Sequence, residues 1–191
     1  VGLITARAGV VVGSGITLSK DGDIFATGVT TSTTFVGTLD GAINSDSNTN
    51  VKVGSTALDS NTTGTLNVAV GDAALTANTT GSNNVAVGRN AMIINTTGES
   101  NTAVGRSALQ QNAASNNTGV GRDALAANTT GTNNVAVGAN ALEANTTSNN
   151  NTAVGRSSLS ANTTGTKNTA VGQGSLASNT TADNNTALGV D

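Results

Sequence analysis

Residues that commonly perform chemistry are scarce in this chain of 191 residues. It has no His and no Cys, so it lacks an imidazole base, a thiolate nucleophile, disulfides and the usual ligands of zinc and haem. Carboxylate and hydroxyl groups remain, but no arrangement of them in the sequence predicts an active site. We therefore expect a protein that is not an enzyme and that uses no cofactor and no metal.

Two short motifs near the start of the chain match ligand-binding loops in part. Asp21 and Asp23 flank a glycine, as cation ligands can, but the further ligand positions of a calcium loop are missing. The run Gly13-Ser14-Gly15 lacks the Gly-Lys-Ser/Thr step and the following helix of a phosphate loop. Turns explain both motifs better.

Four arginines occupy one position of an internal repeat: Arg89, Arg106, Arg122 and Arg156. If the repeats stack, the first three lie one above another and repel each other unless water solvates them. The pattern fits either an anion- or glycan-binding stripe or a solubilising edge, and the second is the simpler interpretation.

The Asn-Thr-Thr steps of the same repeat are formal acceptors for N-linked glycans. A chain so rich in Asn and Thr produces such triplets by composition, and their recurrence at a turn explains them without sugar. Attached glycans would instead indicate a secreted cellular filament.

The overall composition argues against nucleic acids and membranes as partners. The net charge is −3, and the aromatic residues are two Phe, whereas nucleic-acid binding uses clustered cations and stacking aromatics. No apolar run reaches the roughly 18 to 20 residues of a membrane-spanning helix, and residues 1–13 are too short and too weakly basic for a secretory signal. With so few aromatics for a thick core, the abundant Val, Thr, Ala and Leu indicate order by stacking.

A repeat of 17 residues, once 16, runs from residue 50 to the end of the chain. Each copy has a Val-Gly or Leu-Gly pair with an Asn four residues before the glycine. In the first eight copies a large aliphatic residue lies four residues after the glycine, and a second Asn follows three residues later, usually opening Asn-Thr-Thr-Gly. The 16-residue copy loses its residue between Ser115 and Asn117, which marks a surface turn.

The repeated positions form three sets. The first asparagine column comprises Asn50, Asn67, Asn84, Asn101, Asn117, Asn134, Asn151, Asn168 and Asn185. The second asparagine column comprises Asn61, Asn78, Asn95, Asn112, Asn128, Asn145, Asn162 and Asn179. The aliphatic residues expected in the core are Val70, Val87, Val104, Val120, Val137, Val154 and Val171, with Leu58, Leu75, Met92, Leu109, Leu125, Leu142, Leu159 and Leu176.

One copy of the repeat can be interpreted as one coil of a solenoid. The step Asn-Val-Ala-Val-Gly, as in residues 84–88, alternates with the two-residue period of a strand. The segment that follows, such as residues 89–93 or 122–126, fits either a second strand or a helical turn. Because 17 residues are fewer than helix-bearing repeats use, two strands and two turns per coil are favoured. The sequence thus predicts an all-β fold, a parallel β-roll or β-solenoid.

In this solenoid we expect the Val before each glycine and the aliphatic residue after it to point inward. Both asparagine columns suit turns, because Asn tolerates left-handed backbone and stacked amides form ladders. The aliphatic burial available in one coil falls short of the entropy lost on ordering it. The Ala-Gly face is therefore expected to meet another chain, which predicts an intertwined or side-by-side parallel homotrimer.

The run Asn-Thr-Ala-Val-Gly-Arg-Ser-Ala-Leu at residues 101–109, together with the Asn-Thr-Thr-Gly turns, resembles the head repeats of trimeric autotransporter adhesins. With Asn-Asn-Val-Ala-Val-Gly at residues 83–88 and 133–138, it is still more similar to related repeats of bacteriophage tail fibres. The resemblance covers residues 50–191 and implies left-handed parallel β-rolls with three chains side by side. The adhesin-head coil is usually shorter than this one.

The resemblance implies a structural segment of a phage tail fibre in the virion, a rigid spacer that presents a receptor-binding tip for host attachment. Its partners would be further copies of itself, other tail or fibre proteins, and a host surface receptor. Residues 50–191 contain no aromatic side chain with which to grip a receptor, so recognition is expected outside this segment.

Two alternatives remain open. One is a cell-surface adhesin or a glycosylated extracellular filament. The other is an ice-binding β-solenoid, which is disfavoured because the Thr-Thr pairs are expected beside Gly in a turn rather than alternating along a strand.

Residues 1–49 differ in kind and are predicted to form a short β-rich shaft segment ahead of the solenoid at residues 50–191. Apolar stretches such as residues 24–30 are typical of short strands, and Asp21-Gly22 suits a hairpin turn. Residues 31–41 also resemble shaft segments of marine phage fibre proteins, and residues 41–50 are expected to be a flexible junction. The missing initial Met and the stop just after a motif are typical of a fragment.

Overall fold

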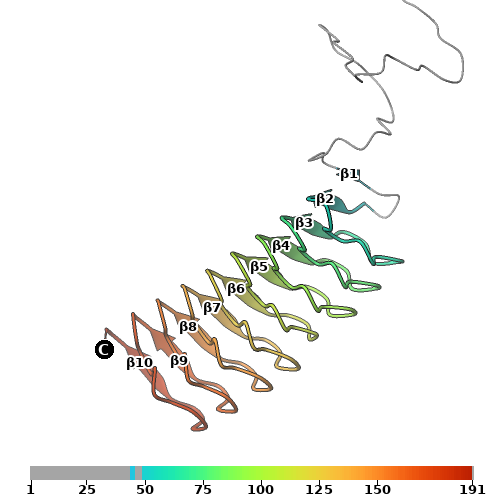
Figure 1. Cartoon of the computed structure of the whole chain (residues 1–191). Coiled ribbons are helices and arrows are strands. Elements are labelled where there is room, and N and C mark those ends of the chain that lie inside the picture. The colour runs from blue at the N-terminus through green and yellow to red at the C-terminus, as the bar shows by residue number, and fades with distance from the viewer. Residues whose placement is uncertain (1–43, 46–48, 191) are drawn as a thin grey trace, which may run out of the picture. The chain divides into compact units, whose positions relative to one another are not determined.

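The computed structural model describes residues 44–45 and 49–190, which contain strands and turns but no helix. Residues 49–190 wind into a parallel β-solenoid, whose coils of about 17 residues stack one on another (Figure 1). The predicted all-β solenoid is thereby confirmed. In this described part of the chain, no helix has the length and apolar character needed to cross a membrane.

Each coil contributes one short strand to a single sheet, in which the strands follow chain order from β1 to β10. Strands β2 to β10 pair in parallel, and each residue lies beside its counterpart one coil away, as Ala86 does beside Ala103. β1 differs, because it pairs antiparallel with β2. The bounds are β1 Asn44–Ser45, β2 Val51–Val53, β3 Val68–Val70, β4 Val85–Val87, β5 Thr102–Val104, β6 Thr118–Val120, β7 Val135–Val137, β8 Thr152–Val154, β9 Thr169–Val171 and β10 Thr186–Leu188.

Each coil has one strand rather than the two that the sequence predicts. The segment after each glycine, such as residues 89–93, is a series of turns whose backbone alternates in handedness. Asn90 and Met92 have φ angles of 60° and 50°, whereas Ala91 between them does not adopt a positive φ. The segment is not a strand, but it still forms backbone hydrogen bonds to the next coil: the Met92 N–H donates to the Ala108 carbonyl at 3.1 Å.

From β3 to β9, the interior of the solenoid holds the central residue of each strand, which is Ala except for Gly119 in β6, against the aliphatic residue of the turn segment. Ala136 and Leu142 are both 0% exposed, whereas Val137 is 36% exposed. A Cβ on Gly119, which replaces that Ala in one coil, would lie only 3.1 Å from Leu109 Cγ. The space opposite each Leu therefore admits a methyl group and little more.

The prediction that the valines before the glycines point inward is therefore wrong. These side chains lie on the outer face of the sheet, half-buried or exposed: Val70, Val87, Val104, Val120, Val137, Val154 and Val171. For the same reason the Ala face, predicted to meet another chain, is enclosed within the coil. The turn-segment residues fulfil the expectation of a core position in seven coils, while Leu176 in the last is half-buried.

The glycine after each strand from β2 to β9 is required by its own backbone and by the neighbouring coil. Gly138 has φ +133°, a conformation that residues with a side chain rarely adopt, and a Cβ on it would lie 2.5 Å from the Gly155 carbonyl oxygen. Left-handed backbone, expected at the two asparagine columns, falls instead at other positions. Leu142, at φ 49°, and Asn133, at φ 58° just before a first-column Asn, are examples.

The shaft segment predicted at residues 1–49, with Asp21, Asp23 and the Gly13-Ser14-Gly15 turn, lies outside the described residues apart from β1 and Thr49. The described residues fall in one of the two units into which the chain divides, Thr38–Asp191.

Candidate functional site

The first asparagine column joins each coil to the next through side chain and backbone together. Asn134 Oδ1 accepts the backbone N–H of Asn151 at 3.0 Å, and Asn134 Nδ2 donates to the Ser148 carbonyl at 2.8 Å. The same pair of bonds recurs at Asn67, whose Oδ1 accepts from Asn84 N–H at 2.9 Å. These asparagines are buried from Asn50 to Asn168, so their side chains stabilise the stack and are not accessible to a ligand.

The second asparagine column forms an amide ladder at the same corner of the coil, because Asn67 of the first column and Asn78 of the second both donate to the Gly81 carbonyl. Asn78 Nδ2 donates to Asn61 Oδ1 at 3.0 Å and also to the Gly81 carbonyl at 2.9 Å. The ladder continues from Asn145 to Asn128 at 2.9 Å. It is interrupted at one level, between the coils that contain Asn95 and Asn112.

The same geometry bears on the Asn-Thr-Thr steps as glycan acceptors. The atom that carries an N-linked sugar is Nδ2, and in Asn78 and Asn128 this atom is a ladder donor in a residue that is 0% exposed. A sugar on these nitrogens would remove ladder bonds and could not fit inside the coil. The folded solenoid is therefore incompatible with glycans at the buried members of this column.

The four repeat-position arginines lie at the surface, and three of them have a carboxylate neighbour. Arg106 and Arg122 both contact Asp123 Oδ2, at 3.2 and 2.9 Å, and Arg89 Nε lies 3.8 Å from Asp72 Oδ2. These side chains are half or more exposed, so the ion pairs add little stability. Their acidic neighbours offset the positive charge that an anion-binding stripe needs, which favours the solubilising edge. Within the described part of the chain, Arg156 has no carboxylate at ion-pair distance.

Acidic groups in the solenoid do not gather into a metal site. The described residues contain no group of three or more Asp and Glu side chains placed to hold a cation. The carboxylate of Asp183 has a lowered pKa. Its main causes are hydrogen bonds from the Thr166 backbone N–H, at 2.5 Å, and from the Thr166 hydroxyl, and the charge of Lys167 contributes less. The bond links two successive coils, so its role is structural.

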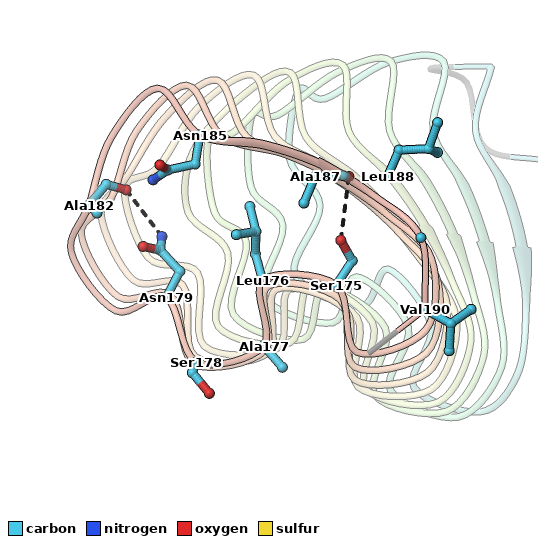
Figure 2. Close-up of a pocket in the computed structure, with 11 residues that line it drawn as sticks. Ser175, Leu176, Ala177, Ser178, Asn179, Ala182, Asn185, Ala187, Leu188 and Val190 are labelled. Carbon is cyan, nitrogen blue, oxygen red and sulfur yellow. Dashed lines mark hydrogen bonds between the residues drawn. The ribbon is translucent and has the colours of Figure 1, made fainter.

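A hollow of about 570 Å³ opens at the last coil, lined by Leu176, Asn179, Asn185 and Ala187 among others. Figure 2 shows Leu176 and Ala187 pointing into it and Leu188 pointing away from it. Every lining position is repeated in the coils below, where the next coil fills the same space. The hollow is thus the open cross-section of the solenoid rather than a dedicated ligand pocket.

The outer face of the sheet carries a stripe of β-branched side chains, two residues wide. We call this the Val/Thr stripe. It comprises Val51, Val68, Val85, Thr102, Thr118, Val135, Thr152, Thr169 and Thr186 in one column and Val53, Val70, Val87, Val104, Val120, Val137, Val154, Val171 and Leu188 in the other. The stripe contains no charged side chain. The sequence analysis missed this stripe because it assigned the valines from Val70 to Val171 in the second column to the core.

The exchange of Val for Thr in the first of these columns was an available signal for an outward position, because an inward hydroxyl would need a buried partner.

Comparison of the chain with protein-family models, with curated proteins and with solved structures finds no match.

Proposed function

We propose that residues 50–191 serve as a rigid structural spacer in a fibre. The observation that supports this most directly is the use of the polar side chains: apart from the break at Asn95 Oδ1, the buried side chains of both asparagine columns bond within the coil and to the next coil. Nine parallel strands at about 4.8 Å per coil give a rod segment roughly 38 Å long. A uniform stack whose polar groups bind its own backbone is suited to bearing load rather than to chemistry.

We further propose that the fibre is a parallel homotrimer in which the Val/Thr stripes of three chains face one another. An uncharged apolar stripe of this length, flanked by polar corners, has the composition of an interface core with a polar rim. Burial of half-exposed valines such as Val137 would add the apolar stabilisation that a thin coil lacks. Parallel chains in register would place identical residues at each level.

Among fibres, the resemblance of the repeats favours a segment of a phage tail fibre, located in the virion. This segment would hold a receptor-binding tip away from the particle, with other tail or fibre proteins at its ends. The alternative is a cell-surface adhesin or an extracellular filament. A glycosylated filament is disfavoured by the buried Nδ2 atoms of the second asparagine column.

The ice-binding alternative needs a second comparison, because threonines do alternate outward along strands such as Thr102-Ala103-Val104. Hydroxyls occupy only one of the two columns, and the other consists of valines up to Leu188. Such a column favours contact with an apolar protein surface over the ordering of water. We therefore place the ice-binding interpretation below the fibre.

A binding assay tests the spacer proposal. Purified protein is applied to a glycan array and to host cells, beside a variant in which Arg89, Arg106 and Arg122 are replaced by Ala. The spacer proposal predicts no saturable binding by either protein. Saturable binding that is lost in the arginine variant would show that the rod itself is adhesive.

A further inference from the structure

At most levels of the solenoid, the Asn-Thr-Thr corner of one coil is tied to the next by several bonds. The Thr79 and Thr80 N–H groups donate to the Thr96 carbonyl at 2.9 and 3.2 Å, and the Thr79 hydroxyl reaches the same oxygen at 3.0 Å. Asn95 Nδ2 then donates to Asn78 Oδ1 at 3.0 Å. Bonds of the same kinds hold the corners above Thr62, Thr129 and Thr163.

One corner lacks all of these bonds. The coil above Asn95 is the 16-residue copy, and Asn112 Nδ2 keeps only the bond within its own coil that other members of the column also make, to the Ala114 carbonyl at 2.8 Å. Asn95 Oδ1 is left buried without a partner. Within the described residues, the N–H groups of Thr96 and Thr97 and the Thr96 hydroxyl donate no bond to the coil above.

The break is confined to that corner. On the strand side of the same level, the Thr102 N–H donates to the Asn117 carbonyl at 2.9 Å, and the Asn117 N–H donates to Asn101 Oδ1 at 2.9 Å. One level higher the corner bonds resume, since the Ala113 N–H donates to the Thr129 carbonyl at 3.0 Å. The two coils are therefore held on either side of the corner, by the Ile94 N–H to the Gln110 carbonyl at 3.4 Å and the Glu99 N–H to Ser115 Oγ at 3.0 Å, and released only at residues 95–97.

We infer that the corner between residues 95–97 and 112–114 is a weak point built into the rod, where the solenoid opens first under heat, denaturant or load. In a stack where each coil contacts only its neighbours, local stability follows the strength of each junction. This junction lacks the corner bonds of its neighbours and has a buried carbonyl without a partner, which is costly in itself. The inference rests on the fold and does not depend on the proposed function.

Amide hydrogen exchange measured by NMR tests the inference at matched sites. The Asn116 N–H bonds across the weak junction to the Glu99 carbonyl at 3.0 Å, and the Asn83 N–H bonds across an intact one to the Thr65 carbonyl at 3.0 Å. Both asparagines follow a serine, so their intrinsic exchange rates match. We expect Asn116 to exchange at least tenfold faster than Asn83. Equal rates would overturn the inference.

Exchanging the two corner sequences supplies a causal control. The repair variant combines Ala113→Thr and Ala114→Thr with a Gly inserted before Ser115, which makes its corner identical to residues 78–84. It should slow the Asn116 amide to the rate of Asn83 and raise the thermal midpoint.

The reverse variant copies the short corner into the intact level, by Thr79→Ala and Thr80→Ala with deletion of Gly81. It should speed exchange at Asn83 at least tenfold. If the reverse variant fails to fold, the repair variant decides alone, and an unchanged Asn116 rate in it would refute the weak point.

Discussion

Replacing Asn134 by Ala isolates the contribution of the first asparagine column to the stability of the stack. Asn134 is 0% exposed and lies in the middle of the solenoid. Its side chain accepts the Asn151 N–H at 3.0 Å and donates to the Ser148 carbonyl at 2.8 Å. The variant Asn134→Ala removes both bonds at once, together with a longer one from Nδ2 to Asn117 Oδ1 at 3.3 Å, whose acceptor keeps the Asn134 N–H at 3.0 Å.

The cost follows from what each partner retains. The Ser148 carbonyl keeps a second donor, Asn145 Nδ2 at 3.3 Å, so its loss is the net worth of one hydrogen bond, about 1 kcal/mol. The Asn151 N–H loses its acceptor inside the coil, and a buried unpaired donor costs about 1 to 3 kcal/mol. The free energy of unfolding should therefore fall by roughly 2 to 4 kcal/mol, which lowers the thermal midpoint by about 4 to 16 °C in a chain of this size.

Thermal unfolding followed by circular dichroism measures this effect, with Thr147→Ala as the matched control. Thr147 is exposed in the same coil region and its side chain bonds to no described residue, so its replacement should shift the midpoint by a degree or two at most. A shift in Asn134→Ala no larger than in the control would refute the view that the column holds the coils together.

Three further predictions test other parts of the structure. Gly138→Ala should lower the thermal midpoint by several degrees, because its φ of +133° and the oxygen 2.5 Å from the new Cβ both resist a side chain; an unchanged midpoint would contradict the close approach of the coils. Ala136→Asp should abolish folding, as measured by circular dichroism, because Ala136 is 0% exposed. Val137→Asp should keep the fold and lose self-association in sedimentation. If Val137→Asp unfolds the chain and Ala136→Asp does not, the valines and not the alanines form the core. The pKa of Asp183 is lowered in the folded state, so the folded protein binds fewer protons than the unfolded chain. The stabilisation from Asp183 is therefore complete above the ordinary carboxyl pKa of about 3.9 and is lost as the pH falls through the lowered folded value. In acid unfolding, Asp183→Asn should not show this loss of stability.

Most of the fold can be predicted from the repeat period. Seventeen residues with glycine after each Val-Ala-Val step exclude a helix-bearing repeat, and β4 and β7 form where that pattern predicts. The face of those strands was assigned wrongly, because the hydrophobicity of Val outweighed that of Ala. The space inside a coil, which a sequence does not state, is what turns Ala86 inward.

The turn segment was unpredictable for a different reason. Local rules reserve left-handed backbone for Gly, Asn and Asp, yet Leu125 adopts φ 52° with its side chain fully buried. Burial of that side chain and the bond from its N–H to the Ala141 carbonyl offset the strain. The asparagine columns were visible in the sequence, but their partners were not, because the backbone N–H that meets Asn134 Oδ1 belongs to the coil above.

Sedimentation equilibrium of the chain at micromolar concentration tests the central proposal, a rod assembled through the Val/Thr stripe, most directly. The proposal predicts three times the mass of one chain for the wild-type protein, and a folded species of single-chain mass for Val137→Asp. A folded wild-type chain that sediments as a monomer, or a Val137→Asp variant that stays trimeric, would contradict it.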